Sequence, residues 1–299
     1  MKILITGGTG LLGKALVETA KKGCKIVATH LGNCDLKNKT CVKYIVIDVR
    51  DEKGGTGLYK EFRPDVTIHT AGVGSPDYAQ RHKKEAREIN IGGTRNILKN
   101  CEKFQSTFMY ISSNGIYDGS AAPYCEDDEA RPINYYGQIK LEGEKISKRS
   151  KVPRSIVRPI LLYGWNHPSG RQNIVTYALS RLENSEEVFV YNDVFVNPIF
   201  APACADAIWK IIKEEKYETF NIAGKDTVSI YELVKSAAEV FDLDPSLVVP
   251  VRQGFFNELV RRPKDTSYNT GKMQDVLGIA PLSIKEGLSL MKKSRKCSA

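Results

Sequence analysis

The chain of 299 residues lacks what a membrane protein or a metal centre requires. No apolar run approaches the roughly 20 residues that a membrane-spanning helix needs. The seven cysteines contain no Cys-x-x-Cys pair and the four histidines are dispersed, so neither set has the spacing of metal ligands. The chain begins with a strand-like run and not with a cleavable signal. We therefore expect a cytoplasmic protein with reduced thiols, no bound metal and no membrane partner.

A concentrated basic stripe is also missing, although the formal net charge is +9. Lysines and arginines are spread along the expected helices, and the one dense run, Lys292–Lys296, stands in the C-terminal tail. An anionic small ligand accommodates the excess charge as well as nucleic acid would. We expect a small-molecule substrate and no nucleic acid.

The most informative local pattern is a glycine turn at the start of the chain. Ile3–Ile5 is typical of a buried strand, and the residues from Leu11 onward have helical spacing. Gly7, Gly10 and Gly13 stand three apart between these two segments. Such a turn directs backbone N–H groups and the positive end of a helix dipole at an anion. The pattern predicts a diphosphate site, with a tight turn that binds nothing as the alternative.

Alternating strands and helices continue to about residue 160. Further strands are expected over Lys25–Thr29, Tyr44–Asp48, Val66–Thr70, Thr107–Ser112 and Ser155–Pro159. Helices are expected over Ala86–Cys101 and Asn134–Ser150, whereas three glycines predict a short or distorted helix over Glu52–Phe62. This alternation is typical of a doubly wound parallel sheet. We expect an α/β fold with a Rossmann dinucleotide-binding domain over residues 1–163.

The second half carries no motif that names a chemistry. Its expected elements are helices over Asn173–Leu182 and Cys204–Lys213, and strands over Val188–Tyr191, Asn197–Phe200 and Thr219–Ile222. Ser229–Glu232 and Ser283–Glu286 have the pattern of a capping box, which opens a helix. We expect a smaller C-terminal α+β substrate lobe over residues 164–196 and 225–299, with residues 197–224 rejoining the Rossmann domain.

The residues at the strand ends indicate which dinucleotide binds. In these folds an acidic residue after the second strand binds the ribose hydroxyls and excludes a 2′-phosphate. Here His30 follows that strand and the first carboxylate is Asp35, while Lys37 and Lys39 could meet a 2′-phosphate. NADP(H) is therefore favoured, with NAD(H) possible. Asp48, after the third strand, is either an acceptor for the adenine amino group or an ordinary turn residue.

A candidate catalytic group combines Ser113, Tyr136 and Lys140. Tyr136 and Lys140 are four residues apart in an expected helix, so both side chains lie on one face. A nearby cation would lower the pKa of the phenol and make it a usable acid or base. Ser113 follows the fifth strand, at the edge where such sheets bind ligands. Its hydroxyl could hydrogen-bond a substrate carbonyl while Tyr136 donates the proton.

In this order, these motifs resemble the extended short-chain dehydrogenase/reductase superfamily, which acts mainly on nucleotide sugars. The matching segments are Thr6–Gly13, Ser112–Tyr117, Tyr136 with Lys140, and Arg158–Gly164. Pro132–Glu144, Asp193 to Pro198 and Arg262 to Lys272 are similar to the dTDP-4-dehydrorhamnose reductase branch. The resemblance implies hydride transfer from NAD(P)H to the 4-keto carbon of a nucleotide-linked 6-deoxy sugar. It also implies that Asn90 helps to position the lysine through water.

The resemblance and the strand ends together imply a set of ligand contacts. Cofactor contacts are expected from Gly7, Thr9, Gly10, Leu11, Leu12, Gly13, His30, Asp48, Val49, Thr70, Ala71, Gly72, Asn90, Tyr136, Lys140 and Pro159. Substrate contacts are expected from Ser112, Asn114, Asn173 and Arg262. The family's usual Asp is replaced by Asn114 and its usual Gln by Val194, which puts the sugar in doubt.

Two other functions stay open. A nucleotide-sugar 4-epimerase needs the same three catalytic residues and a tightly held NAD. The regulatory β subunit of methionine adenosyltransferase resembles the same branch, binds NADP and docks on another protein. A nucleotide-sugar dehydratase is disfavoured, because Asn114–Gly115 supplies no extra acid or base. The expected partners are a nucleotide-sugar substrate and a second copy of the chain in a homodimer.

Overall fold

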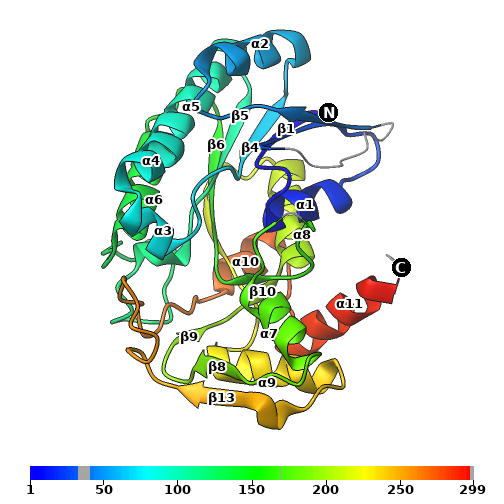
Figure 1. The fold of residues 1–299 in the computed structure, drawn as a ribbon. Helices are drawn as coiled ribbons and strands as arrows, with labels where there is room; N and C mark the ends of the chain where they lie inside the picture. The colour runs from blue at the N-terminus through cyan, green and yellow to red at the C-terminus, as the bar shows by residue number, and fades with distance from the viewer. Residues whose placement is uncertain (33–40, 169, 297–299) are drawn as a thin grey trace.

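The computed structural model describes residues 1–32, 41–168 and 170–296 (Figure 1). A seven-stranded parallel sheet has the strand order β11-β6-β5-β4-β1-β2-β3. Its strands are β1 Lys2–Thr6, β2 Lys25–His30, β3 Val42–Val46, β4 Val66–His69, β5 Thr107–Ile111, β6 Arg154–Pro159 and β11 Thr219–Ile222. The order reverses between β1 and β4, as in doubly wound dinucleotide folds. The expected Rossmann sheet is confirmed.

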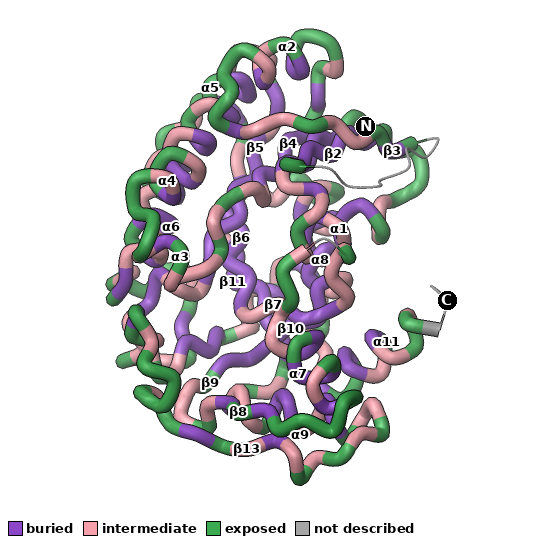
Figure 2. The backbone as a smooth tube through the Cα atoms, in the orientation of Figure 1, coloured by how far each residue is buried: buried purple, intermediate pink, exposed green. Residues whose placement is uncertain are grey.

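Alternate residues of β1 explain how helices cover both faces of the sheet. Ile3 and Ile5 pack in the cluster that contains α1 (Leu11–Glu18) and α8 (Ala201–Lys213), while Leu4 packs in the opposite cluster. That opposite layer is formed by α2 Glu52–Phe62, α5 Gly93–Phe104 and α6 Tyr135–Lys148 (Figure 1). Figure 2 shows the sheet as the buried centre of this arrangement. The two-residue period of the strand therefore supplies both layers of core.

Two helical expectations need correction. Glu52–Phe62 is one continuous α-helix, capped by the Asp51 carboxylate, because buried Leu58 and Tyr59 outweigh the low helix propensity of its glycines. The expected helix Ala86–Cys101 is helical throughout, but it comprises the end of α4 Lys83–Arg87, a π-helical turn Glu88–Gly92 and most of α5, and it is preceded by α3 Pro76–Arg81. The π-helical turn carries Asn90. Single π turns of this kind are frequent at functional sites.

The lobe follows the carboxyl end of β6 and lies below the sheet in Figure 1. Strands β8 Val188–Tyr191 and β13 Val248–Val251 pair in parallel under α7 Ile174–Leu182 and α9 Ile230–Val240. The remaining elements are β7 Leu162–Tyr163, β9 Phe195–Val196, β10 Ile199–Phe200, β12 Val228–Ser229, α10 Gly271–Leu277, α11 Ile284–Lys296 and short 3-10 turns at Asn114–Ile116 and Pro245–Leu247. In the sequence, α8 and β11 stand between the two parts of the lobe. Helix α8 packs on α1, and β11 pairs with β6.

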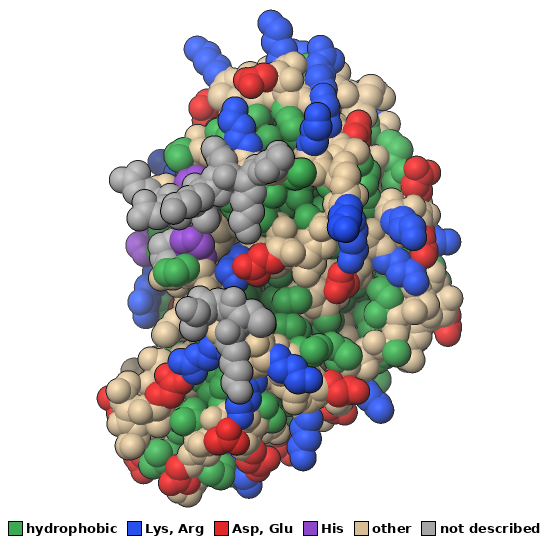
Figure 3. Space-filling view, turned by 90° about the vertical axis from the view of Figure 1, so that its right-hand side faces the viewer, with side chains coloured by type: hydrophobic (Ala, Val, Ile, Leu, Met, Phe, Trp, Pro, Cys, Tyr) green, Lys and Arg blue, Asp and Glu red, His purple; other side chains and the backbone are tan. Residues whose placement is uncertain are grey.

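Local signals in this half are partly confirmed. Ser229 N–H donates to Glu232 at 2.7 Å and Ser283 N–H donates to Glu286 at 2.8 Å, so both capping boxes form. Of the strand expected over Asn197–Phe200, only β10 Ile199–Phe200 forms, because Pro198 cannot donate to a ladder, and the separate strand β9 precedes it. On the face shown in Figure 3, Lys and Arg side chains are spread out with Asp and Glu among them. No helix in the described ranges is long and apolar enough to cross a bilayer.

Candidate active site

The glycine turn packs tightly and leaves a helix end open. Gly7 has a φ of +73°, and a Cβ there would lie 2.9 Å from the Ala71 backbone. A Cβ at Gly13 would lie 2.1 Å from the Gly7 carbonyl oxygen, so only glycine lets α1 approach the turn. Gly10 is the N-cap of α1, without a capping side chain and without an acidic residue in the first turn. The free N–H groups of this helix end suit a diphosphate.

The other expected residues of this turn differ in what they can offer. Thr9 and Leu11 are partly exposed beside the turn, whereas the Leu12 side chain is buried in the core. A ligand could therefore meet Leu12 through its backbone N–H alone. The Thr70 hydroxyl donates to the Thr6 carbonyl oxygen at 2.6 Å, which ties the loop after β4 to the turn.

A buried histidine connects the loops around this turn. The hydrogen-bond order follows from the backbone groups: Ala71 N–H donates to the Thr6 hydroxyl, and that hydroxyl donates to His69 Nδ1 at 2.7 Å. His69 Nε2 donates to the Thr94 hydroxyl at 3.1 Å, which donates to the Asn90 carbonyl. Burial, together with the nearby Lys140 cation, lowers the pKa of His69 to about 3. The imidazole is thus neutral and uses both nitrogens.

Asn90 clamps the loop after β4. Its Oδ1 accepts from Val73 N–H at 2.7 Å and its Nδ2 donates to the Val73 carbonyl at 3.1 Å. Gly72 lies beneath the amide, where a Cβ would be 3.1 Å from Oδ1. The resemblance assigned Asn90 a role in positioning Lys140. In this structure its side chain holds Val73, and with it the small residues Ala71 and Gly72.

Ser113 and Tyr136 meet at the carboxyl end of β5. The Ser113 hydroxyl caps the 3-10 turn by accepting from Gly115 N–H at 3.1 Å, and it lies near enough to the Tyr136 phenol to lower the pKa of that phenol. A Cβ at Gly115 would lie 3.1 Å from the Tyr136 ring and 3.5 Å from Ser113 Oγ. At Gly137 it would lie 2.0 Å from the Gly115 carbonyl oxygen. Sequence reasoning missed these two glycines, which allow the start of α6 to reach the turn.

Lys140 lies behind this pair, on the same helix. Its ammonium donates to the Ile111 carbonyl at 2.9 Å, and burial lowers its pKa to about 8. We expected the ammonium to lower the pKa of Tyr136. Instead, burial raises that pKa, and the lowering influence is the hydrogen bond from Ser113. The phenol is therefore protonated at neutral pH, as a proton donor must be.

The neighbours of Ser113 have different surroundings. The Ser112 hydroxyl is buried and has no hydrogen-bond partner among the described residues. The Asn114 amide donates to the Thr266 hydroxyl at 2.7 Å, which connects the turn after Ser113 to the C-terminal part of the chain. Pro159 ends β6 as a buried residue.

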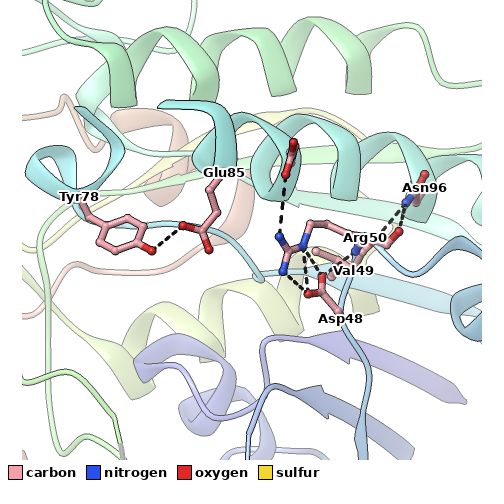
Figure 4. A network of polar contacts seen from close by, with 7 residues as sticks. Asp48, Val49, Arg50, Tyr78, Glu85 and Asn96 are labelled. Carbon is pink, nitrogen blue, oxygen red and sulfur yellow. Dashed lines mark hydrogen bonds and ion pairs between the residues drawn. The ribbon is translucent and has the colours of Figure 1, made fainter. Parts of the chain in front are cut away.

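Asp48 follows β3 and is hydrogen-bonded within its own turn (Figure 4). Both of its carboxylate oxygens accept from the Arg50 guanidinium, with a shortest distance of 2.6 Å, and these bonds lower the pKa of Asp48. Asp48 thus holds its own turn, and its contact with the adenine amino group stays a prediction. The next residue, Val49, is buried, and its carbonyl accepts from Asn96 at 3.2 Å. Figure 4 also shows the Tyr78 phenol donating to Glu85.

The end of β2 is only partly described. His30 is buried, with its ring edge-on to Tyr44 at 6.3 Å between centroids. The other residues invoked for a 2′-phosphate, Lys37 and Lys39, lie outside the described residues, as does Asp35.

Asn173 and Arg262 are both engaged with other parts of the protein. The Asn173 amide caps α7 by accepting from Val175 N–H at 3.1 Å and donates to the Gly164 carbonyl at 2.7 Å. The Arg262 guanidinium pairs with Asp77 on α3. The segment after β13 therefore reaches from the lobe to the helical layer of the Rossmann part.

An aromatic pocket in the lobe was not anticipated from the sequence. It has a volume of about 330 Å³ and lies between α7 and β8, lined by Tyr177, Arg181, Phe189, Tyr191 and Phe256, among others. Phe189 stacks on Phe255 at 5.4 Å, and Tyr191 meets Phe256 edge-on at 5.4 Å. The relevant signal was the pair Phe255–Phe256, two large apolar residues in a segment without strand or helix periodicity.

Comparisons with known proteins agree with this fold. The family model described as RmlD substrate binding domain matches residues 1–296. The dTDP-4-dehydrorhamnose reductase of Bacillus anthracis, solved in complex with NADP, superposes with a TM-score of 0.86 at 25% identity, over 98% of this chain and 99% of that one. The rat methionine adenosyltransferase 2 subunit beta is 26% identical over 96% of this chain and 87% of that protein. The Aggregatibacter actinomycetemcomitans dTDP-4-dehydrorhamnose reductase is 25% identical over 94% of each chain.

Proposed function

Because the chain belongs to the RmlD substrate binding domain family, we propose that it reduces the 4-keto group of a nucleotide-linked 6-deoxy sugar with NADPH. The observation that carries the proposal is that Ser113, Tyr136 and Lys140 come together at the carboxyl end of β5. Gly115 packs against both the Ser113 hydroxyl and the Tyr136 ring, and the buried Lys140 ammonium donates to the Ile111 carbonyl. A serine, a tyrosine and a lysine in this arrangement can protonate a carbonyl oxygen as it becomes an alkoxide. The bacterial reductases similar over the whole chain support the same chemistry.

The proposed mechanism assigns one task to each side chain. NADPH, when bound, supplies the hydride to the carbonyl carbon. The Tyr136 phenol donates its proton to the carbonyl oxygen, and the Ser113 hydroxyl turns from Asn114 to donate a hydrogen bond to the same oxygen. The Lys140 ammonium, which donates to the Ile111 carbonyl, is assigned to the cofactor that it is expected to contact. The raised pKa of Tyr136 suits reduction, because the free phenol retains its proton at neutral pH.

The cofactor fits the glycine turn before α1 and the loop after β4. The uncapped N-terminus of α1 would hold the diphosphate, and the loop from Thr70 to Gly72, held by His69 and Asn90, would line the ribose. NADPH is proposed over NADH because His30 stands where an acidic residue would exclude a 2′-phosphate. NADP in the similar Bacillus anthracis structure supports this choice.

The nucleotide part of the substrate is assigned to the lobe. We propose that the aromatic pocket between α7 and β8 receives the nucleoside base, since exposed Phe256 and Phe189 offer ring faces for stacking. Asn173, Arg262, Ser112 and Asn114 remain the proposed contacts for the diphosphate and sugar.

The test is NADPH oxidation with a panel of nucleotide 4-keto sugars, followed by the loss of reduced-cofactor absorbance. Turnover with a 4-keto-6-deoxy sugar is the expected result. Tight NADPH binding without oxidation of any sugar would contradict the reductase and favour the regulatory function suggested by the similarity to methionine adenosyltransferase 2 subunit beta. NAD that copurifies and resists dialysis would instead favour the epimerase.

Replacement of Tyr136 tests the mechanism. Tyr136→Phe should lower kcat by about 10²-fold or more, because it removes the proton donor, and should leave NADPH affinity nearly unchanged. Tyr135→Phe is the matched control, since Tyr135 is the preceding tyrosine and its phenol donates to the Lys83 carbonyl on the neighbouring helix. Turnover retained by Tyr136→Phe would rule out Tyr136 as the donor.

A further inference from the structure

A buried ion pair lies on the same face of α6 as Tyr136 and Lys140, one turn beyond Lys140. Glu144 Oε1 and Oε2 accept from Arg158 Nε and Nη2 of β6 at 2.9 and 2.8 Å. The two side chains are 1% and 3% exposed, whereas every other ion pair between described residues has partly exposed side chains. Arg158 precedes Pro159, an expected cofactor contact, in the segment Arg158–Gly164. The Arg158 side chain points into the interior.

The remaining donors of Arg158 reach the catalytic turn. Nη1 donates to the Tyr117 phenol oxygen and to the Glu126 carbonyl, both at 2.8 Å. Tyr117 directly follows the 3-10 turn that Ser113 caps. One guanidinium therefore connects α6, which carries Tyr136 and Lys140, with β6 and with the chain that leaves Ser113.

Glu144 also supplies the negative charge near Lys140. The two residues are four apart on α6, so their side chains lie on one face. The Lys140 ammonium lies 5.4 Å from the Tyr110 ring centroid on β5, and neutral His69 faces it from β4. Tyr110 and Tyr136 are phenols with raised pKa values. Glu144 is thus the carboxylate that opposes the effect of burial on Lys140.

A buried ion pair costs so much desolvation that an apolar pair of similar volume is often more stable. Stability alone therefore does not explain why these charges are here. We propose that Glu144 and Arg158 are positioning residues: they fix α6 against the Ser113 turn, and the Glu144 carboxylate keeps the Lys140 ammonium charged. The catalytic consequence rests on the proposed function, but the charge state of Lys140 does not.

The first experiment reads the ionisation of Lys140 directly. The protein is labelled with ¹³Cε-lysine, the Lys140 signal is identified by its loss in Lys140→Arg, and its chemical shift is followed from pH 6 to 11. Glu144→Gln should lower the pKa of Lys140 by about one unit from its value in the unchanged protein, because the countercharge is lost. Glu142→Gln is the matched control, since Glu142 lies on the same helix and pairs with Arg87 on the exposed face at 2.7 Å. An unchanged Lys140 pKa in Glu144→Gln would overturn the proposal.

A double variant separates the charge effect from simple packing. Glu144→Leu with Arg158→Met removes both charges and fills similar volume, so its free energy of unfolding should return close to that of the unchanged protein. The Lys140 pKa should nevertheless stay below the unchanged value, because Glu144 is missing. If the Lys140 pKa and the free energy of unfolding both equal those of the unchanged protein, the pair contributes packing alone. If Glu144→Gln does not fold, this variant decides the question.

The activity arm tests positioning. With a nucleotide 4-keto sugar that the unchanged protein reduces, the double variant should lose at least about tenfold in kcat. The alkaline limb of its pH–rate profile should move to lower pH. Unchanged kcat would contradict the positioning role. If no sugar is reduced at all, the proposed function fails while the Lys140 titration still tests the charge role of Glu144.

Discussion

At the scale of single residues, the site contains two buried bases, and burial disfavours the charged form of each. Lys140 has its pKa lowered to about 8 and His69 to about 3. Both changes have the same main cause, since a charged form loses its hydration when it is buried. Their consequences differ because they fall in different pH ranges. Lys140 changes its charge just above neutrality, whereas His69 stays neutral throughout the physiological range.

His69 should make stability fall in acid. Between about pH 6.5 and 3 the unfolded histidine binds a proton that the folded one does not, so the free energy of unfolding falls as pH falls. One such proton is worth about 1.4 kcal/mol per pH unit. In His69→Gln, urea unfolding between pH 6 and 4 should therefore depend less on pH than in the unchanged protein. An identical slope would mean that His69 is already protonated in the folded state.

At the scale of elements, α6 depends on glycine where it meets the turn after Ser113. Gly137→Ala would place a Cβ 2.0 Å from the Gly115 carbonyl, so α6 must shift. We expect a loss of about 1–3 kcal/mol in the free energy of unfolding, with a lower kcat because Tyr136 moves. Gly57→Ala is the control, because no atom lies within 4 Å of a Cβ at that position on α2. That change should stabilise the protein by about 0.5–1 kcal/mol. A fully active Gly137→Ala protein would show that the contact is not needed.

The elements differ in how far the sequence could predict them. Tyr136 and Lys140 could be placed together because helix periodicity fixes which residues share a face. The continuous helix Glu52–Phe62 could not be predicted from the sequence, because its stability comes from Leu58 and Tyr59 packing on distant parts of the chain. The same limit applies to the pKa of Tyr136. Residue spacing located the nearby cation, but the depth of burial, which decides the direction, is a tertiary property.

At the scale of the whole molecule, Arg262 and Asp77 form one of the contacts between the lobe and the Rossmann part. This pair is partly exposed, with side chains 27% and 31% exposed, so it contributes little to stability. We expect Arg262→Ala to change the free energy of unfolding by less than about 1 kcal/mol. The KM for the sugar nucleotide should rise about tenfold or more as a charge-assisted bond to the diphosphate is lost.

Asp77→Asn distinguishes the two roles that Arg262 could have. If Arg262 binds the diphosphate, removal of its carboxylate partner frees the guanidinium, and the KM should stay constant or fall. A rise in KM equal to that of Arg262→Ala would instead identify the pair as a connector between the two parts. Steady-state kinetics at saturating NADPH provides the measurement for both variants.

The open end of α1 also bears on how this protein could be engineered. Gly10 has φ −67° and ψ 163°, angles that other residues adopt freely, so backbone geometry does not require glycine at this N-cap. Gly10→Asp should supply the missing cap and raise the melting temperature of the ligand-free protein, yet its carboxylate would occupy the place proposed for the diphosphate and weaken NADPH binding by at least about tenfold. Thermal melts with and without NADPH would measure both effects. Selection for thermostability alone would thus favour a variant such as Gly10→Asp, in which the new carboxylate stabilises the helix end but NADPH binding is weakened.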